Sequence, residues 1–441
     1  PKYTSGTYVG TILGKKDSTA TVNLTNVHSL LYKYNNGSNL SLIHAVDNSL
    51  YSTCTRQNKS DVAGLKSYST AKVMNLFSSE TAKGHWVCSA DSMPVLTYFA
   101  DEYAAGVLEM NTDWYDESAS EYTLQDAGDL MGFAVLSQKN TFAGKTVKLG
   151  ADIVLNEDMS DPKILWPGIG ASSSKFEGTF DGQGHTISGI YQTGSSQLQG
   201  FFADVKGGTL KNFRLVNSSF AFTGTHAMAF VGSIAGRVNG GTGGAVLENI
   251  YADAAVFGKG RFVGGLVGSN DGGNITLTNC WNAGNVSGES TEIGGIFGTA
   301  NGIVTMRNVL NTGNVTAVSG TYVGGLIGFC HANSLIDIAY ALTVGTVSSA
   351  ATSGTGTVIG SINLTKATLA EIYAIQAEGL GECNQTVDAD GITSLAKSAL
   401  TGEAAVTAAP ALFDQKNASE QSYWSVSENG TPVLGTLLPQ D

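Results

Sequence analysis

The sequence predicts an all-β solenoid in which short parallel strands stack as the rungs of a β-helix. The first observation is a glycine-rich phrase that recurs every 30 residues. Its copies are FVGGLVG at 262–268, EIGGIFG at 292–298 and YVGGLIG at 322–328. The second is a phrase that runs in step with the first, NCWNAGNV at 279–286 and NVLNTGNV at 308–315, whose copies start 29 residues apart. A fixed period of this size is typical of a solenoid, in which each unit buries its apolar face only against its neighbours.

The composition of each unit explains why it would form one coil. Runs of four to six residues alternate β-branched or aromatic residues with small polar ones, which favours strands, and the glycines between them supply positive φ at the corners. Stacked rungs lie about 4.8 Å apart, so like residues would form columns. One predicted inward column is Val263, Ile293 and Val323. A second column, predicted to form a stacked amide ladder, is Asn249, Asn279, Asn308 and Asp337.

Composition and charge exclude several classes of protein. Among 441 residues there are 56 glycines without a Gly-X-Y triplet, and the 42% apolar fraction is too high for a disordered chain. The formal charge of −13 argues against nucleic acid or an anionic membrane as a partner. No apolar run approaches the roughly 20 residues that span a bilayer. The chain opens on Pro1 without a signal peptide, which suggests a mature or trimmed form.

Internal similarity predicts two modules. The segment SGTYVG at 5–10 is identical to 319–324, and Trp precedes Pro by eight residues both at 86–94 and at 424–432. We therefore expect residues 1–97 to be the C-terminal part of a preceding β-helix-type module, 98–120 to be a linker, and 121–435 to be a complete module. Its repeats would cover about 200–362, and its tail, helical or irregular, 363–435.

Short helices are expected at the ends of the second module. Asp126 or Asp129 could cap a helix whose apolar stripe includes Leu130 and Phe133 and which would cover the open end of the solenoid. Helix formers also predict helices over 369–377 and 392–400. The five cysteines show no zinc spacing: Cys280, Cys330 and Cys383 are expected to be buried free thiols, and Cys54 with Cys88 is the one pair to consider for a disulfide.

These phrases, together with FEGTFDGQGH at 176–185, resemble those of bacterial surface proteins that carry the GLUG repeat. The resemblance covers most of 121–435 and, more loosely, 1–97, and weakens after Gly345. It implies a right-handed parallel β-helix in a secreted or wall-attached bacterial protein, as an accessory module of adhesin-like proteins or of secreted peptidases. The repeat has no catalytic residues of its own, so the resemblance assigns none to this chain.

Parallel β-helices also include polysaccharide lyases and hydrolases, so an enzyme site has to be considered. The best catalytic candidates are Asp181 and His185, in a phrase similar to one seen in polygalacturonases; the simpler interpretation is a tight corner between two strands. Oxygen ligands for calcium could come from four acidic residues, but their spacing matches no defined calcium-binding loop, so a solvated loop is the favoured interpretation. These residues are Asp152, Glu157, Asp158 and Asp161.

Aromatic residues offer a binding hypothesis, because sugars stack on exposed rings. Trp281, Tyr251 and Tyr340 lie near one register of the predicted coil and could form such a row, or could fill wide corners of the core. The sequence therefore predicts an extracellular surface module that acts in adhesion, binds host or environmental glycans or glycoproteins, or presents further modules of the same polypeptide. The alternatives are a polysaccharide-active hydrolase or lyase and a structural spacer of a secreted peptidase.

Overall fold

The computed structural model describes residues 110–437, except 163, 352, 378, 385–386 and 429, and the backbone of four short strands before them. The chain divides into two compact units, Pro1–Val107 and Leu108–Asp441. In the first unit, β1 (His28–Leu30) pairs in parallel with β2 (Thr55–Gln57), and β3 (Trp86–Cys88) pairs in antiparallel fashion with β4 (Pro94–Leu96). The possible Cys54–Cys88 disulfide and the predicted end of a preceding module lie largely outside the described residues.

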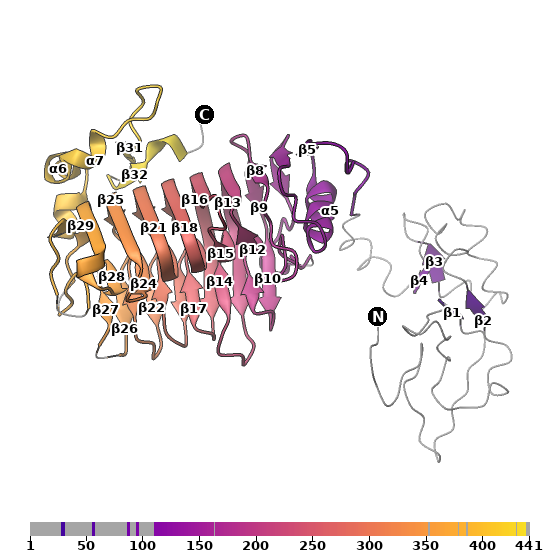
Figure 1. The fold of residues 1–441 in the computed structure, drawn as a ribbon, viewed down its shortest axis with the longest axis horizontal. Coiled ribbons are helices and arrows are strands. Elements are labelled where there is room, and N and C mark those ends of the chain that lie inside the picture. The colour runs from indigo at the N-terminus through magenta and orange to yellow at the C-terminus, as the bar shows by residue number, and fades with distance from the viewer. Residues whose placement is uncertain are drawn as a thin grey trace, which may run out of the picture. The chain divides into compact units, whose positions relative to one another are not determined.

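The second unit is a parallel β-solenoid, which confirms the predicted fold class (Figure 1). Its first rungs contain β5 (Glu121–Leu124), β6 (Thr146–Leu149), β7 (Ile153–Val154), β8 (Thr179–Asp181), β9 (Thr186–Ser188) and β10 (Tyr191–Gly194). The main wall continues through β12 (Phe202–Lys206), β13 (Thr209–Phe222), β15 (Ala235–Asn239), β16 (Ala245–Gly258), β18 (Val267–Asn282), β19 (Val286–Gly288), β21 (Phe297–Asn311) and β22 (Val315–Ala317). It ends with β24 (Ile327–Cys330), β25 (Leu335–Thr343), β26 (Val347–Ser349), β28 (Ile359–Ser361), β29 (Ala367–Ile375) and β30 (Ile392–Leu395).

The glycine-rich phrases form a separate six-stranded parallel sheet. Its strands are β11 (Leu198–Gln199), β14 (Phe230–Gly232), β17 (Phe262–Gly264), β20 (Ile293–Gly294), β23 (Val323–Gly324) and β27 (Thr355–Gly356). Val263, Ile293 and Val323 pair in register and are fully buried, as predicted. A Cβ on Gly264 would collide with the carbonyl oxygen of Val267, so glycine is required where the chain turns between the two sheets.

The asparagine column exists but runs differently from the prediction at its last position. Asn249 Nδ2 donates to Asn212 Oδ1 at 2.9 Å, and Asn279 Nδ2 donates to Asn249 Oδ1 at 2.8 Å. Asp337, however, pairs with Thr305, so Tyr340 is the residue opposite Asn308. The prediction of Asp337 was wrong because a turn at 331–334 lengthens this rung, whereas β21 is continuous in the rung before.

A helix covers the first rungs, as predicted. Helix α5 (Ala127–Ser137) is capped by Asp126, whose side chain accepts a hydrogen bond from the backbone N–H of Asp129. Asp129 itself accepts from the Gln125 N–H and the Asn111 side chain. Phe133 is fully buried and makes ring contacts with Phe142, Phe176 and Phe180, so the helix joins the solenoid core instead of lying on its surface.

The predicted helices over 369–377 and 392–400 were wrong. Residues 367–375 form β29, which pairs with β25, and β30 pairs with β29 in turn; only Lys397–Leu400 forms a turn of 3₁₀-helix, η5. Ile372 and Ala374 are fully buried in the stack. Pairing with the open edge of the preceding rung therefore stabilises the strand by more than the weak helix propensity of this segment favours a helix.

The last residues run back along the side of the solenoid, and we call 400–437 the C-terminal clasp (Figure 1). It contains α6 (Glu403–Ala408), α7 (Pro410–Phe413), β31 (Trp424–Val426), β32 (Pro432–Leu434) and the 3₁₀ turn η6 (Gly435–Leu437). Its apolar side chains bury an outward column of the rungs, Trp281, Leu310, Leu342 and Tyr373. Strands β31 and β32 pair Trp424 with Leu434, the same register in which β3 and β4 pair Trp86 with Leu96.

The cysteine prediction is confirmed where the structure describes it. Cys280, Cys330 and Cys383 are free and buried. Burial raises the pKa of Cys280 and of Cys383 to about 12, with nearby carboxylates contributing, so both thiols are protonated at neutral pH. Among the described residues, no helix is both long and apolar enough to cross a bilayer.

Candidate functional site

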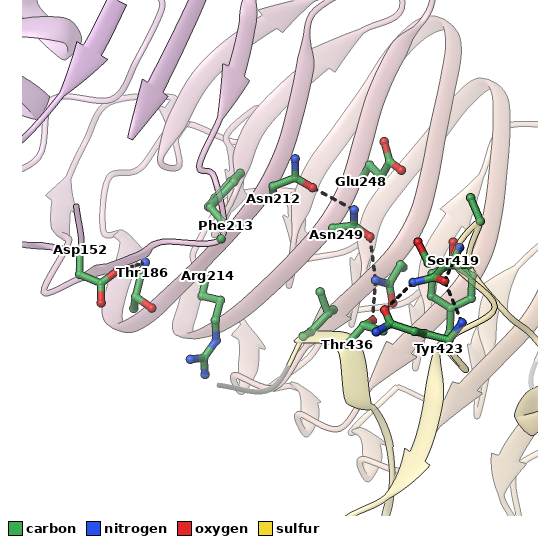
Figure 2. A pocket seen from close by; sticks show the side chains of 16 residues that line it. Asp152, Thr186, Asn212, Phe213, Arg214, Glu248, Asn249, Ser419, Tyr423 and Thr436 are labelled. Atoms are coloured by element: carbon green, nitrogen blue, oxygen red, sulfur yellow. Dashed lines mark hydrogen bonds between the residues drawn. The ribbon is translucent and has the colours of Figure 1, made fainter. Parts of the chain in front are cut away.

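A groove of about 730 Å³ lies between the asparagine ladder and the C-terminal clasp (Figure 2). We call it the ladder groove. The solenoid contributes Asp152, Gly184, Thr186, Asn212, Phe213, Arg214, Glu248, Asn249 and Asn279. The clasp contributes Asn417, Ala418, Ser419, Gln421, Tyr423, Thr436 and Leu437. Segments far apart in the sequence therefore form its two sides.

The floor of the groove is the amide ladder. It begins at Asp181, whose Oδ1 accepts from Asn212 Nδ2 at 3.0 Å, and continues through Asn249 to Asn279. The three asparagines have φ between 53° and 58°, a left-handed conformation that Asn adopts more readily than most residues. At Asn279 the ladder meets the clasp, because the side-chain oxygen of Thr436 lies 3.0 Å from its Nδ2.

Beyond Asn279, the ladder side chain hydrogen-bonds to the clasp instead of to the next asparagine. Trp424 Nε1 donates to Asn308 Oδ1 at 3.0 Å. Asn279 Oδ1, which Asn308 would otherwise bind, is buried and accepts no hydrogen bond from any described residue. The clasp therefore covers the second half of the ladder, and the groove is the part of the same face that it leaves open.

Arg214 is a cation of the groove that no carboxylate of the described residues neutralises. It lies next to Tyr251 on the adjacent strand, with its guanidinium carbon 5.0 Å from the ring centroid. Its Nε is buried, and no residue in the described part of the chain accepts a hydrogen bond from it. Every other arginine between residues 110 and 437 pairs with a carboxylate. These pairs are Arg237 with Asp204, Arg261 with Glu292, and Arg307 with Asp337.

Two further polar groups line the groove. Glu248 is half-buried and takes part in no hydrogen bond or ion pair in the described structure; its neighbour on the adjacent strand, Lys211, is 3.4 Å from Asp181 instead. Tyr423 enters from the clasp. Burial raises the pKa of Tyr423, and the negative charge of Glu248 raises it further, so the phenol remains a hydrogen-bond donor.

The two predicted catalytic residues do not meet. Asp181 accepts from the Gln183 N–H and from Asn212, and lies near Lys211. Burial would raise the pKa of Asp181, but these hydrogen bonds and the lysine charge outweigh burial and hold it below its usual value. An Asp in this state is a poor general acid. His185 Nδ1 instead lies 3.0 Å from Asp152 Oδ1, which also accepts the Thr186 N–H.

The four acidic residues considered for calcium are not gathered into one site. Asp152 is engaged with His185, while Glu157, Asp158 and Asp161 lie on the following loop, where Asp158 accepts from Ser160. Across the described residues, no three or more His, Cys, Asp or Glu side chains are placed to hold a metal ion. Calcium binding by these residues stays a prediction.

The aromatic row differs from its prediction in two respects. Tyr251 and Trp281 are neighbours in register, 4.9 Å apart between ring centroids, but Leu310 and Leu342 continue their column, and Tyr340 lies two residues before Leu342 in its own strand. Trp281 is only 6% exposed because the clasp covers it. Tyr251 and Tyr340 are half-buried against the same cluster. Sugar stacking on Trp281 would require the clasp to move away; binding by these residues stays a prediction.

The sequence interpretation did not identify Arg214, Glu248 or Tyr423. A signal for Arg214 was available, since it follows Asn212 by two residues just as Trp281 follows Asn279. No periodicity could have placed Tyr423 beside Glu248, because the clasp is not part of the repeat.

No protein-family model matches the sequence, and no curated protein matches it. Among solved structures, the chain is similar to a crystal structure of a "putative immunoglobulin A1 protease" from Bacteroides ovatus. The TM-score is 0.53 at 21% identity, and the match covers 72% of this chain and 92% of that one. At this identity the likeness concerns the fold alone.

Proposed function

We propose that this chain belongs to a secreted or surface-attached bacterial protein and acts in adhesion, with the ladder groove as a binding site for a glycan or glycoprotein. The observation that supports this most directly is the groove itself. Its floor repeats an amide at each rung, and its walls carry a cation, a carboxylate and a phenol.

Sugars suit this chemistry. Each hydroxyl both donates and accepts hydrogen bonds, and the groove supplies both kinds of partner, since Arg214 and Tyr423 donate and Glu248 accepts. The floor side chains stand on paired strands, which fixes their positions before a ligand arrives. A site of this kind loses little conformational freedom on binding.

A second candidate is a structural spacer within a secreted peptidase. It is favoured by the similarity to the Bacteroides ovatus protein, which is named for protease activity, and by the absence of a contact between Asp181 and His185 in the described structure. A polysaccharide hydrolase or lyase is the weaker alternative, because its two candidate catalytic residues, Asp181 and His185, each bind other partners in the described structure. Presentation of other domains on a rigid rod is compatible with either role.

The proposal is tested by screening the full chain against an array of host and plant glycans and glycoproteins. The groove variant is Ser419→Trp, which places a large side chain at an exposed position of the groove wall. The matched control is Thr316→Trp, at an exposed position of β22 that does not line the groove. We expect selective binding by the wild type and the control, and loss of binding in the groove variant. Silence across the array would contradict the proposal and leave the spacer as the better explanation.

A further inference from the structure

Arg214 is the feature of the ladder groove that says most about its ligand. Its guanidinium is held against the face of Tyr251, and its buried Nε finds no acceptor among the described residues. Because Nε is itself buried, a ligand in the groove would be met by the two terminal nitrogens of this half-buried side chain, which are hydrogen-bonded to no described residue. From this we propose that Arg214 binds the carboxylate of a terminal acidic sugar, of the sialic or uronic acid type. The inference rests on the proposed function.

The geometry favours a carboxylate over a neutral acceptor. An arginine presents its N–H groups as a planar fork that matches the two oxygens of a carboxylate. Contact with the aromatic ring restricts the orientation of the guanidinium before binding, which reduces the entropy lost when the pair forms. No carboxylate of the described chain competes for this position, unlike those that occupy Arg237, Arg261 and Arg307.

The surrounding charges indicate one acidic group, at the end of the ligand. Lys211, a neighbouring cation along the ladder, is already engaged with Asp181. Glu248 and Asp152 line the same groove and would repel further negative charges. A polyuronate or a sulfated chain would therefore meet repulsion on both sides of Arg214. A single terminal acid followed by neutral sugars would place hydroxyl or acetamido groups against Glu248 and the ladder amides.

The experiment compares three ligands on the full chain by calorimetric titration or ligand-observed NMR: sialyllactose, lactose as its neutral counterpart, and polygalacturonate as a polyanion. We expect sialyllactose to bind most tightly. Since a hydrogen bond to a charged group contributes roughly 1.5–3 kcal/mol, Arg214→Gln should raise its Kd by roughly ten- to a hundredfold. Arg307→Gln removes an arginine outside the groove and should leave the Kd unchanged. Glu248→Gln should tighten binding of polygalacturonate by removing repulsion.

The outcomes separate the inference from the function on which it rests. If lactose binds as tightly as sialyllactose, or if Arg214→Gln leaves the Kd of sialyllactose unchanged while circular dichroism shows a folded protein, the groove binds glycans but the role of Arg214 is wrong. If polygalacturonate binds best, the single-acid argument is wrong. If none of the three binds and the wider array is also silent, the proposed function itself fails.

Discussion

At the residue scale, the ladder asparagines combine two requirements that few side chains meet together. Each adopts positive φ and each donates to its neighbour along the stack, while Asn212 and Asn249 also accept from the asparagine of the next rung. The recurrence of Asn in the sequence was enough to predict this column. The prediction was wrong at Asp337 because the number of residues per rung varies. A constant spacing along the sequence cannot reveal that one turn is longer than the others.

Replacement of Asn249 separates the two requirements. Asn249→Ala removes two amide hydrogen bonds and places a Cβ-bearing residue without a polar side chain at φ 53°, so we expect a loss of about 2–4 kcal/mol in the free energy of unfolding. Asn249→Gly loses the same hydrogen bonds without the left-handed strain and should be about 1 kcal/mol less destabilising. Urea unfolding followed by circular dichroism gives both values. Equal losses would show that backbone strain contributes nothing here.

At the scale of elements, the N-terminal helix and the C-terminal clasp differ in how visible they are from the sequence. The capping Asp126 and the apolar stripe of α5 are local signals, and they were sufficient. The clasp depends on contacts between segments distant in sequence, such as Trp424 with Asn308, and nothing local reveals them. The same holds for β29, whose strand conformation is imposed by the rung beneath it.

The clasp should be the element most sensitive to a single substitution. Trp424 is 2% exposed and packs in the cluster that covers Trp281. Trp424→Ala should cost about 3–5 kcal/mol and make the clasp susceptible to limited proteolysis, because a large buried side chain is lost. Trp424→Phe keeps a ring but not the indole N–H, and should lose less. A cleavage pattern unchanged from wild type in Trp424→Ala would show that the clasp is held elsewhere.

At the scale of the whole molecule, the repeated unit fixes the architecture while its irregularities determine the site. The 30-residue period alone was sufficient to predict the parallel stack and the buried Val263 column. The groove could not be predicted, because it exists only where a repeated face meets a non-repeated segment. Arg214 is an example: its position in the repeat could be read from the sequence, but the absence of a carboxylate partner for it among the described residues could not.

Modularity can be tested by removing one rung. Deletion of 279–307 joins Thr278 to Asn308 and preserves the order of strands around the coil, so we expect a folded protein with strand-rich circular dichroism and a lower Tm. Deletion of 293–307, about half a rung, would bring strands of different walls into register and expose apolar faces. That chain should aggregate. Similar behaviour of the two deletions would argue against independent rungs.

The clasp also determines how the molecule would respond to mechanical load. Its last turn, η6, contacts β16, so the chain leaves the solenoid on its flank and not at its final rung (Figure 1). Tension applied through the C-terminal end would first act on the clasp and the side chains beneath it. The last rungs would bear that force only after the clasp had peeled away. Peeling would uncover Trp281 and the rest of its apolar column, so a pulled molecule would present a surface that the resting one conceals.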